Sequence, residues 1–348
     1  MNDLPSHDDA GFVRRLMLAI LVLGLTWIAW QLRAVVVLAF GAVLFAIVLD
    51  SLRDVLEHRL RLPHRASLTT SILLVIGGFA LTLMLFGSQI AGQTEAISEA
   101  LPAAVAELKR LAAGFGLGRW VEQGIAEFAK GSGMTGNIGS FLLSVGDGVT
   151  NLIILLVGGI FLASKPQLYR TGLIKLVPPS QRSHAATALD DCRTALRLWL
   201  KGRLLAMVLI GLLTGIGLWL IGVPSYFALA LLAALLEFIP FFGPILAAVP
   251  AILLALLGSP ADALLVAGLF LVLQQVEGNL ITPIIQEHAV ELPPALLLFA
   301  LLAFGLLFGV LGVILAEPLT VAIFVLVKRL YVREALHTRT PMPGKAET

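Results

Sequence analysis

Apolar residues form eight long and nearly uninterrupted stretches along the chain. They cover residues 16–32, 34–49, 66–90, 141–163, 204–222, 226–257, 263–285 and 294–327. A helix needs about 20 apolar residues to cross a bilayer core, whereas a barrel strand shows about 10 residues of alternating polarity. Polarity does not alternate in these stretches. The sequence therefore predicts an all-α integral membrane protein with about eight transmembrane helices.

The lengths of the stretches predict where helices pair and where they break. The first two are short and nearly meet at Arg33, which predicts a tight helical hairpin. The stretches 226–257 and 294–327 are too long for one straight span, so each is tilted, broken or re-entrant. We therefore expect broken or re-entrant helices in the C-terminal half of the chain.

The stretches and the segments between them predict five regions. These are three N-terminal spans (1–90), an external amphipathic region (91–140), the fourth span with a basic amphipathic region (141–203), a C-terminal core with broken helices (204–330) and a tail (331–348). Apolar residues recur every three to four positions in 95–111 and in 185–200, which is typical of amphipathic helices. The helix over 185–200 is expected to continue into the fifth span.

Composition and charge agree with a membrane protein and predict its orientation. The chain is 58% apolar and 13% charged, with a mean hydropathy of +0.96. Residues 50–65 carry four Arg, 165–203 carry eight Lys or Arg, and the tail after Val327 carries five. Because cytoplasmic segments retain Lys and Arg, both termini are predicted to be cytoplasmic. The run after Arg15 has the outline of a signal peptide, but it lacks a small-residue cleavage site and is expected to stay as the first span.

The cysteine and histidine residues show no spacing typical of a disulfide or a metal site. Cys192 is the single cysteine, so no intramolecular disulfide can form, and the six histidines lack the spacing of metal ligands. We therefore expect no metal site and no organic cofactor.

The stretch "LLEFIPFFGPILAAVP" (235–250) places helix breakers beside a carboxylate. Pro240 and Pro244 each lack an N–H, Gly243 weakens the helix between them, and Glu237 lies one turn earlier. Backbone that is not helical at membrane depth must face protein or a water-filled cavity. Broken helices in transporters surround a substrate or an ion in this way. A proline kink packed between helices is the alternative interpretation.

The seventh stretch carries a second polar group, in "LVLQQVEGNLITPIIQ" (271–286). Its candidate site residues are Gln274, Gln275, Glu277, Asn279 and Pro283. Amides at helix contacts in membranes are common, and contacts of that kind are the alternative here.

Charge adds a further argument for an ion site. Between residues 204 and 327 the chain has no Lys or Arg, but it has three carboxylates in or near apolar runs: Glu237, Glu277 and Glu317. A buried carboxylate without a cationic partner takes up a proton or binds a cation, which suits coupling to H⁺ or Na⁺. Arg33, Arg53 or a neighbouring subunit could still reach these glutamates, and Glu317 could lie at the membrane interface.

These motifs resemble the autoinducer-2 exporter family of bacterial membrane transporters. The family pattern E/N-x-I-P-x-x-G-P falls on Glu237, Ile239, Pro240, Gly243 and Pro244, and its Q-x-x-E-x-N-x-x-x-P pattern falls on Gln274, Glu277, Asn279 and Pro283. Its late glycine and P-L elements fall on Phe308, Gly309, Gly312, Pro318 and Leu319. Glu317 departs from the pattern, since members more often have an apolar residue there, and Pro293-Pro294 replaces the usual H-P.

The resemblance implies a secondary transporter of the bacterial inner membrane, with no enzymatic activity and no nucleic-acid partner. It implies a homo-oligomer, for which a pentamer is one option, and a small polar solute or a monovalent cation as the transported species. Some members export a furanone-type signal, and others resemble sodium or lithium/proton antiporters. The chain has no G-x-x-x-x-G-K-[ST] motif, so active transport must use an ion gradient.

Three other classes of protein are weighed against a transporter. A passive channel could use the same polar segments, and flux against a gradient separates the two. An intramembrane hydrolase would need a second aspartate to act with the one in "VGDG" (145–148). A purely structural role would leave the carboxylates and the broken helices without a reason.

Overall fold

The computed structural model describes residues 16–17, 24, 27, 30–91, 138–281, 283, 292–338 and 340. All regular structure in these residues is helical, which confirms the predicted all-α class. The external region predicted for 91–140 lies almost wholly outside them, as do most of the first predicted span and residues 341–348. The hairpin predicted around Arg33 therefore stays a prediction.

The described helices succeed one another with mostly short connections. In chain order they are α2 (Arg33–Leu60), α3 (His64–Ala91), α6 (Ile138–Ser164), α7 (Pro166–Lys175), the short 3-10 helix η1 (Pro179–Gln181), α8 (Arg182–Ile221), α9 (Tyr226–Leu236), α10 (Phe242–Gly258), α11 (Pro260–Val276), the π-helical η2 (Glu277–Ile281), α13 (Pro294–Ile314), α14 (Ala316–Val327) and the π-helical η3 (Lys328–Ala335).

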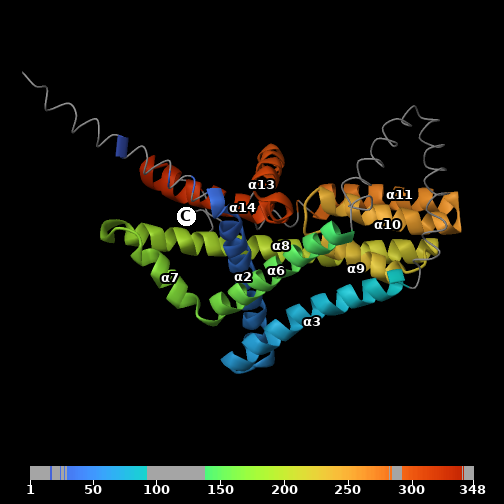
Figure 1. Cartoon of the computed structure of the whole chain (residues 1–348), viewed down its shortest axis with the longest axis horizontal. Coiled ribbons are helices and arrows are strands. Elements are labelled where there is room, and N and C mark those ends of the chain that lie inside the picture. The colour runs from blue at the N-terminus through green and yellow to red at the C-terminus, as the bar shows by residue number, and fades with distance from the viewer. Residues whose placement is uncertain are drawn as a thin grey trace, which may run out of the picture.

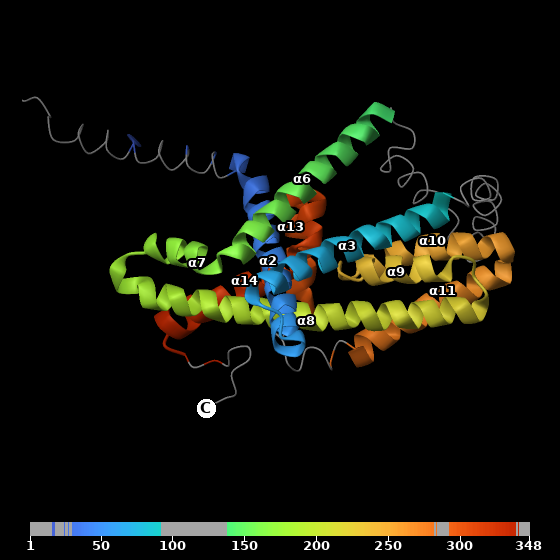
Figure 2. The same cartoon turned by 90° about the horizontal axis from the view of Figure 1, so that it is seen from below.

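The longest helix, α8, organises the molecule. Its 40 residues span about 60 Å, since an α-helix rises 1.5 Å per residue. In Figures 1 and 2 it runs along the molecule, and α2 crosses it. The amphipathic segment 185–200 and the fifth predicted span belong to this one helix, as expected. α8 ends at Gly222, whose φ of 85° gives the left-handed conformation that commonly ends a helix.

Two apolar cores lie along α8. The first joins α2, α8 and α14, and it includes Leu44, Leu200 and Val325. The second joins the end of α8 to α9, α10 and α11, and it includes Leu218 and Ala251. Small residues such as alanine let helices approach closely in a membrane, where packing drives their association. The part of α8 between Leu200 and Leu218 passes from one core to the other.

The chain reverses direction between α9 and α10. The two helices pack side by side, as Figure 1 shows, and residues of both belong to the second apolar core. Gly243 lies so close to Leu236 that a Cβ atom at position 243 would overlap the Leu236 backbone. The break predicted within 226–257 is therefore a helical hairpin.

A second sharp turn lies inside α13 at Gly309. This residue has φ 65° and ψ −145°, a backbone region that only glycine adopts readily. A Cβ atom on Gly312 would overlap the Phe304 carbonyl, and one on Gly305 would lie 3.0 Å from Val313 Cγ2. Residues eight apart in a straight helix are about 12 Å apart along its axis. The stretch 294–327 is therefore broken, as its length predicts.

Replacing Gly243 by alanine is expected to prevent the α9–α10 hairpin from closing. The new Cβ would meet backbone atoms of Leu236, which cannot move aside as a flexible side chain can. We expect a loss of at least about 3 kcal/mol of stability, seen as a lower melting temperature in detergent. Gly268→Ala is the matched control, because a Cβ there meets nothing within 4 Å. Equal melting temperatures for the two variants would contradict the hairpin.

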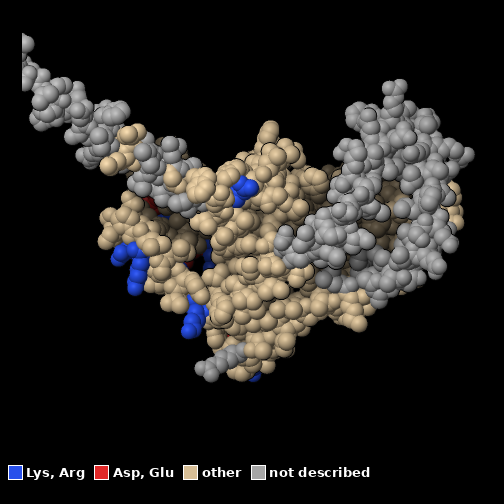
Figure 3. Space-filling view, in the orientation of Figure 1, with Lys and Arg blue, Asp and Glu red and all other residues tan. Residues whose placement is uncertain are grey.

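Residues of the three basic segments lie together around the N-terminal half of α8, and we call this region the basic end. Arg193 and Arg197 of α8 form ion pairs with Asp50 and Asp54 of α2. Arg329 of η3 lies 3.7 Å from Asp191 of α8. On the face shown in Figure 3, several Lys and Arg side chains lie toward the α7 end. Parts of the segments 50–65, 165–203 and 328–335 are therefore neighbours at the basic end.

The number of spans follows only in part from the described residues. Four of their helices are long and apolar enough to cross a membrane, and a fifth span results if the 90° bend between Gly148–Ser164 and Pro166–Lys175 lies within one crossing. These helices support a multi-pass membrane protein. The predicted number of eight stays a prediction.

Candidate functional site

Four charged side chains meet where three helices are interrupted. Glu237 follows α9 at the hairpin tip, Glu277 follows α11 at the start of η2, and Glu317 lies in the first turn of α14. Arg203 of α8 lies beside them, with its Nη1 atom 3.5 Å from Oε1 of Glu237. Glu277 and Glu317 both interact electrostatically with Glu237. We call these four residues the carboxylate cluster.

The carboxylate cluster is buried and rich in polar atoms. Glu237 is 1% exposed and the Arg203 side chain is 11% exposed. Both carboxylate oxygens of Glu237, Oε2 of Glu317, and Nε and Nη2 of Arg203 are buried without a hydrogen-bond partner among the described residues. Buried polar atoms are normally satisfied, because leaving one without a partner costs about 1–3 kcal/mol. The cluster therefore has the chemistry to bind a proton, a cation or a polar solute.

The helical repeat of α8 determines which side of the helix Arg203 lies on. Trp199, Arg203, Ala206 and Ile210 recur at helical spacing along one side of this helix. The Trp199 ring packs edge-on against Phe238 at the hairpin tip, with ring centroids 5.8 Å apart. Ala206 and Ile210 pack with Ile281 of η2. One side of α8 therefore holds both the hairpin tip and η2 next to the Arg203 guanidinium.

Glu237 has a cationic partner from outside the stretch 204–327, and that partner is Arg203 and not Arg33 or Arg53. Arg203 stands one position before the stretch without Lys or Arg, and it reaches Glu237 from there. The other two arginines considered are engaged elsewhere, since Arg33 stacks on Trp30 and Arg53 pairs with Asp50. Sequence reasoning missed Arg203 because it ends a basic segment. The "KGR" directly before an apolar run is the one signal that could have identified it.

The two prolines occupy different places at the break. Pro240 is buried in the turn between α9 and α10, whereas Pro244 lies in the first turn of α10. A proline is tolerated there because the first N–H groups of a helix lack partners within it. Pro240 therefore lies within the break and Pro244 directly after it, at the start of the next helix.

Phe241 completes the turn with a strained backbone. Its φ is 64° and its ψ −42°, and the Phe242 N–H donates to the Pro240 carbonyl at 2.7 Å. This is a γ-turn with positive φ, a rare conformation for a residue with a side chain. Strain of this kind gathers at functional sites. The strained turn lies four residues from Glu237.

The amides of the seventh stretch lie apart from the buried glutamate. Gln274, Gln275 and Asn279 are exposed, and Nδ2 of Asn279 donates to Oε1 of Gln275 at 3.2 Å. Pro283 is also exposed. Of the five candidates in this stretch, the structure brings Glu277 into the carboxylate cluster.

The candidate residues nearest the C-terminus lie around the turn at Gly309. Gly309 forms that turn, and Gly312 and Pro318 are buried near it. Glu317 is half-buried, and its Oε2 atom is inaccessible to solvent. The residue that departs from the family pattern therefore contributes to the carboxylate cluster.

Comparison with known proteins gives one family. Residues 16–331 match the model of the AI-2E family transporters. The putative transport protein YueF of Bacillus subtilis is 26% identical over 278 residues, which cover 74% of each chain. YrrI of the same organism, also a putative transport protein, is 36% identical over 151 residues, or 43% of each chain. The putative permease PerM of Escherichia coli is 24% identical over 206 residues, which cover 55% of this chain and 58% of PerM.

Proposed function

Because the chain belongs to the AI-2E family of transporters, we propose that it is a secondary transporter that moves a small polar solute across the bacterial inner membrane, coupled to H⁺ or Na⁺. Its family is one of transporters and not of enzymes. The solute is a signal molecule or a metabolite. The carboxylate cluster is the proposed coupling site.

The buried Arg203–Glu237 pair at the tip of a helical hairpin carries this proposal. Three carboxylates face one guanidinium, so the ionised cluster has a net charge of −2. Such a charge inside a membrane is unfavourable unless protons or cations neutralise it. Arg203 compensates Glu237, and Glu277 and Glu317 supply further oxygens. Uptake or release of an ion then changes the charge of the hairpin tip, which couples the ion to the movement of the helices.

Reconstitution tests the coupling directly. Purified protein in liposomes is given an imposed pH or sodium gradient, and the uptake of small polar metabolites and a furanone-type signal is measured. We expect uptake against the solute gradient that stops when the ion gradient is dissipated. Downhill flux of the solute that does not depend on the pH or sodium gradient would identify a passive channel instead.

The composition of the cluster favours a second candidate function, exchange of Na⁺ or Li⁺ for H⁺. Carboxylate oxygens are suitable ligands for small hard cations, and three carboxylates meet here. In the same liposomes without any solute, an antiporter would acidify or alkalinise the lumen in response to a sodium gradient. A solute-coupled transporter would require the solute for that response.

We further propose that the protein is a homo-oligomer, with a pentamer as the assembly to test. Large apolar side chains on α8 face outward, among them Leu212, Ile216 and Trp219. In a membrane such faces contact lipid or another subunit.

The shared basic end is expected to face the cytoplasm, which labelling can test. Lys175 lies before α8 and Pro224 after it, and both are exposed at opposite ends of this long helix. In a Cys192→Ser background, an impermeant thiol reagent on intact cells should label Pro224→Cys and spare Lys175→Cys. The reverse pattern would invert the orientation.

A further inference from the structure

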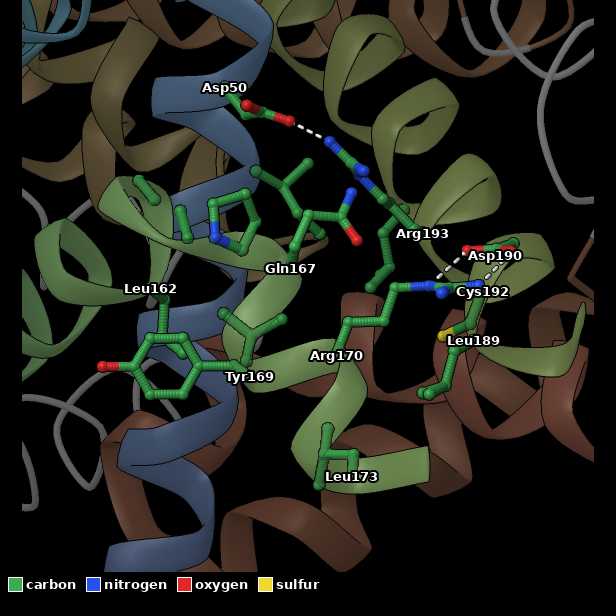
Figure 4. A pocket seen from close by; sticks show the side chains of 16 residues that line it. Asp50, Leu162, Gln167, Tyr169, Arg170, Leu173, Leu189, Asp190, Cys192 and Arg193 are labelled. Atoms are coloured by element: carbon green, nitrogen blue, oxygen red, sulfur yellow. Dashed lines mark hydrogen bonds and ion pairs between the residues drawn. The ribbon is translucent and has the colours of Figure 1, made fainter. Parts of the chain in front are cut away.

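A cavity separate from the carboxylate cluster lies between α2, α6, α7 and α8. Its volume is about 210 Å³, and none of the four cluster residues lines it. Apolar side chains form most of its wall, including Val43, Ile47, Leu162, Ala163 and Leu196. Figure 2 shows α6, α7 and α8 around this region, and Figure 4 shows the side chains that line it. The wall is suited to a hydrocarbon chain.

Polar groups lie together on one side of this cavity. The Arg170 guanidinium donates from Nε to Oδ1 of Asp190 at 3.0 Å and from Nη2 to Oδ2 at 2.6 Å. Arg193 donates to Asp50, and Figure 4 shows both arginines on the same side as Gln167. The Arg170, Asp190 and Arg193 side chains are 34%, 56% and 45% exposed. A guanidinium has five N–H donors, so both arginines have donors left for a ligand.

The position of α7 indicates what the cavity opens onto. α7 leaves α6 at 90° and exposes Leu168 and Leu173, followed by the exposed Leu176. Lys175 and Arg170 lie on the same short segment. Leucines together with basic residues on a short helix are typical of a helix in the membrane interface. The charged side of the cavity therefore lies at the level of lipid headgroups.

The local charges favour one class of headgroup. Four charged side chains line the cavity: the guanidinium groups of Arg170 and Arg193 and the carboxylates of Asp190 and Asp50, which pair with them. These four charges sum to zero, so a net anionic headgroup would add uncompensated charge. A zwitterion preserves the balance, because its phosphate contacts arginine and its ammonium contacts aspartate.

We propose that this cavity binds one phospholipid with a primary ammonium headgroup, such as a phosphatidylethanolamine. An acyl chain lies against the apolar wall, the phosphate binds Arg170 and Arg193, and the ammonium binds Asp190. The lipid then joins α7 to α8 and holds the bend after α6. The site is independent of the ion coupling proposed above, since it shares no residue with the carboxylate cluster.

Native mass spectrometry of the full-length protein tests this site with three synthetic lipids of equal chain length. The lipids carry ethanolamine, choline or glycerol headgroups. We expect one ethanolamine lipid to be retained about tenfold more tightly than the choline lipid, whose quaternary ammonium has no N–H donor. Equal retention of all three, or preference for the anionic glycerol lipid, would overturn the proposal.

Two variants locate the binding. Arg170→Gln removes a partly exposed guanidinium and is expected to lower retention about tenfold, whereas Lys175→Gln, next to the cavity but outside its lining, should not. Ala46→Phe fills the cavity without changing any charge and should lower retention of the ethanolamine lipid. Unchanged retention in Arg170→Gln and in folded Ala46→Phe would show that the lipid binds elsewhere.

Discussion

Glu237→Gln is expected to abolish ion-driven transport while the protein stays folded and inserted. Glutamine keeps the size of the side chain but cannot ionise, so the hairpin tip can no longer exchange a proton or cation. Gradient-driven uptake in liposomes should fall to the level of empty liposomes. Downhill exchange of solute can survive, because the helices and the hairpin are intact. The pH and sodium dependence of any remaining flux should disappear.

Glu334→Gln is the control for this result. Glu334 also faces an arginine, at 3.4 Å from Arg329, but it lies at the basic end of the molecule. Its replacement should leave gradient-driven uptake unchanged. Glu277→Gln is expected to behave as Glu237→Gln does, since the two carboxylates interact. If both variants keep ion-driven flux with an unaltered pH profile, the cluster is not the coupling site.

The break at residues 237–241 could be predicted because its cause is local. A proline removes one hydrogen bond of a helix, and a nearby glycine weakens the helix further. The length of 294–327 predicted the second break in the same way, and Gly309 supplies it. The reversal at Gly243 could not be predicted, because it depends on how Leu236 packs against the returning chain. A sequence pattern shows that a helix stops, but not the direction in which the chain continues.

The composition of the carboxylate cluster was only partly predictable, for a different reason. Glu237, Glu277 and Glu317 are recognisable because carboxylates are costly in apolar stretches. Arg203 is not recognisable in that way, since it follows seven other basic residues in 165–203. Arg203 reaches the hairpin tip because α8 continues without a break from the basic segment to Glu237. The amides Gln274 and Gln275 are just as recognisable in the sequence, but they are exposed on α11 and lie outside the cluster.

Two turns and one π-helical segment lie around the cluster. Glu237 and Glu277 follow the C-terminal ends of helices, where the last C=O groups lack partners within the helix, and Glu317 lies at an N-terminal end, where the first N–H groups lack them. A continuous span would hide these groups. Interrupted helices therefore provide both the charge and the polar backbone around it, as the broken helices of transporters do.

Arg203→Gln is expected to destabilise the protein more than any other single change in the cluster. It leaves the carboxylate of Glu237, which is 1% exposed, without its guanidinium. Removing one partner of a buried ion pair costs about 3–5 kcal/mol, because the remaining charge stays desolvated. The variant should therefore melt at a lower temperature in detergent and give less folded protein.

The double variant Arg203→Gln/Glu237→Gln separates this electrostatic cost from lost packing. Removing both charges leaves two neutral amides of similar length, so much of the stability should return, while ion-driven uptake stays absent. A double-mutant cycle then gives the coupling energy between the two side chains. If the double variant melts as low as Arg203→Gln alone, Arg203 acts through its packing on α8 and not as the counter-ion of Glu237. Recovery of stability without recovery of transport would show that the cluster keeps a buried ion pair for function, since neutral residues hold the fold as well.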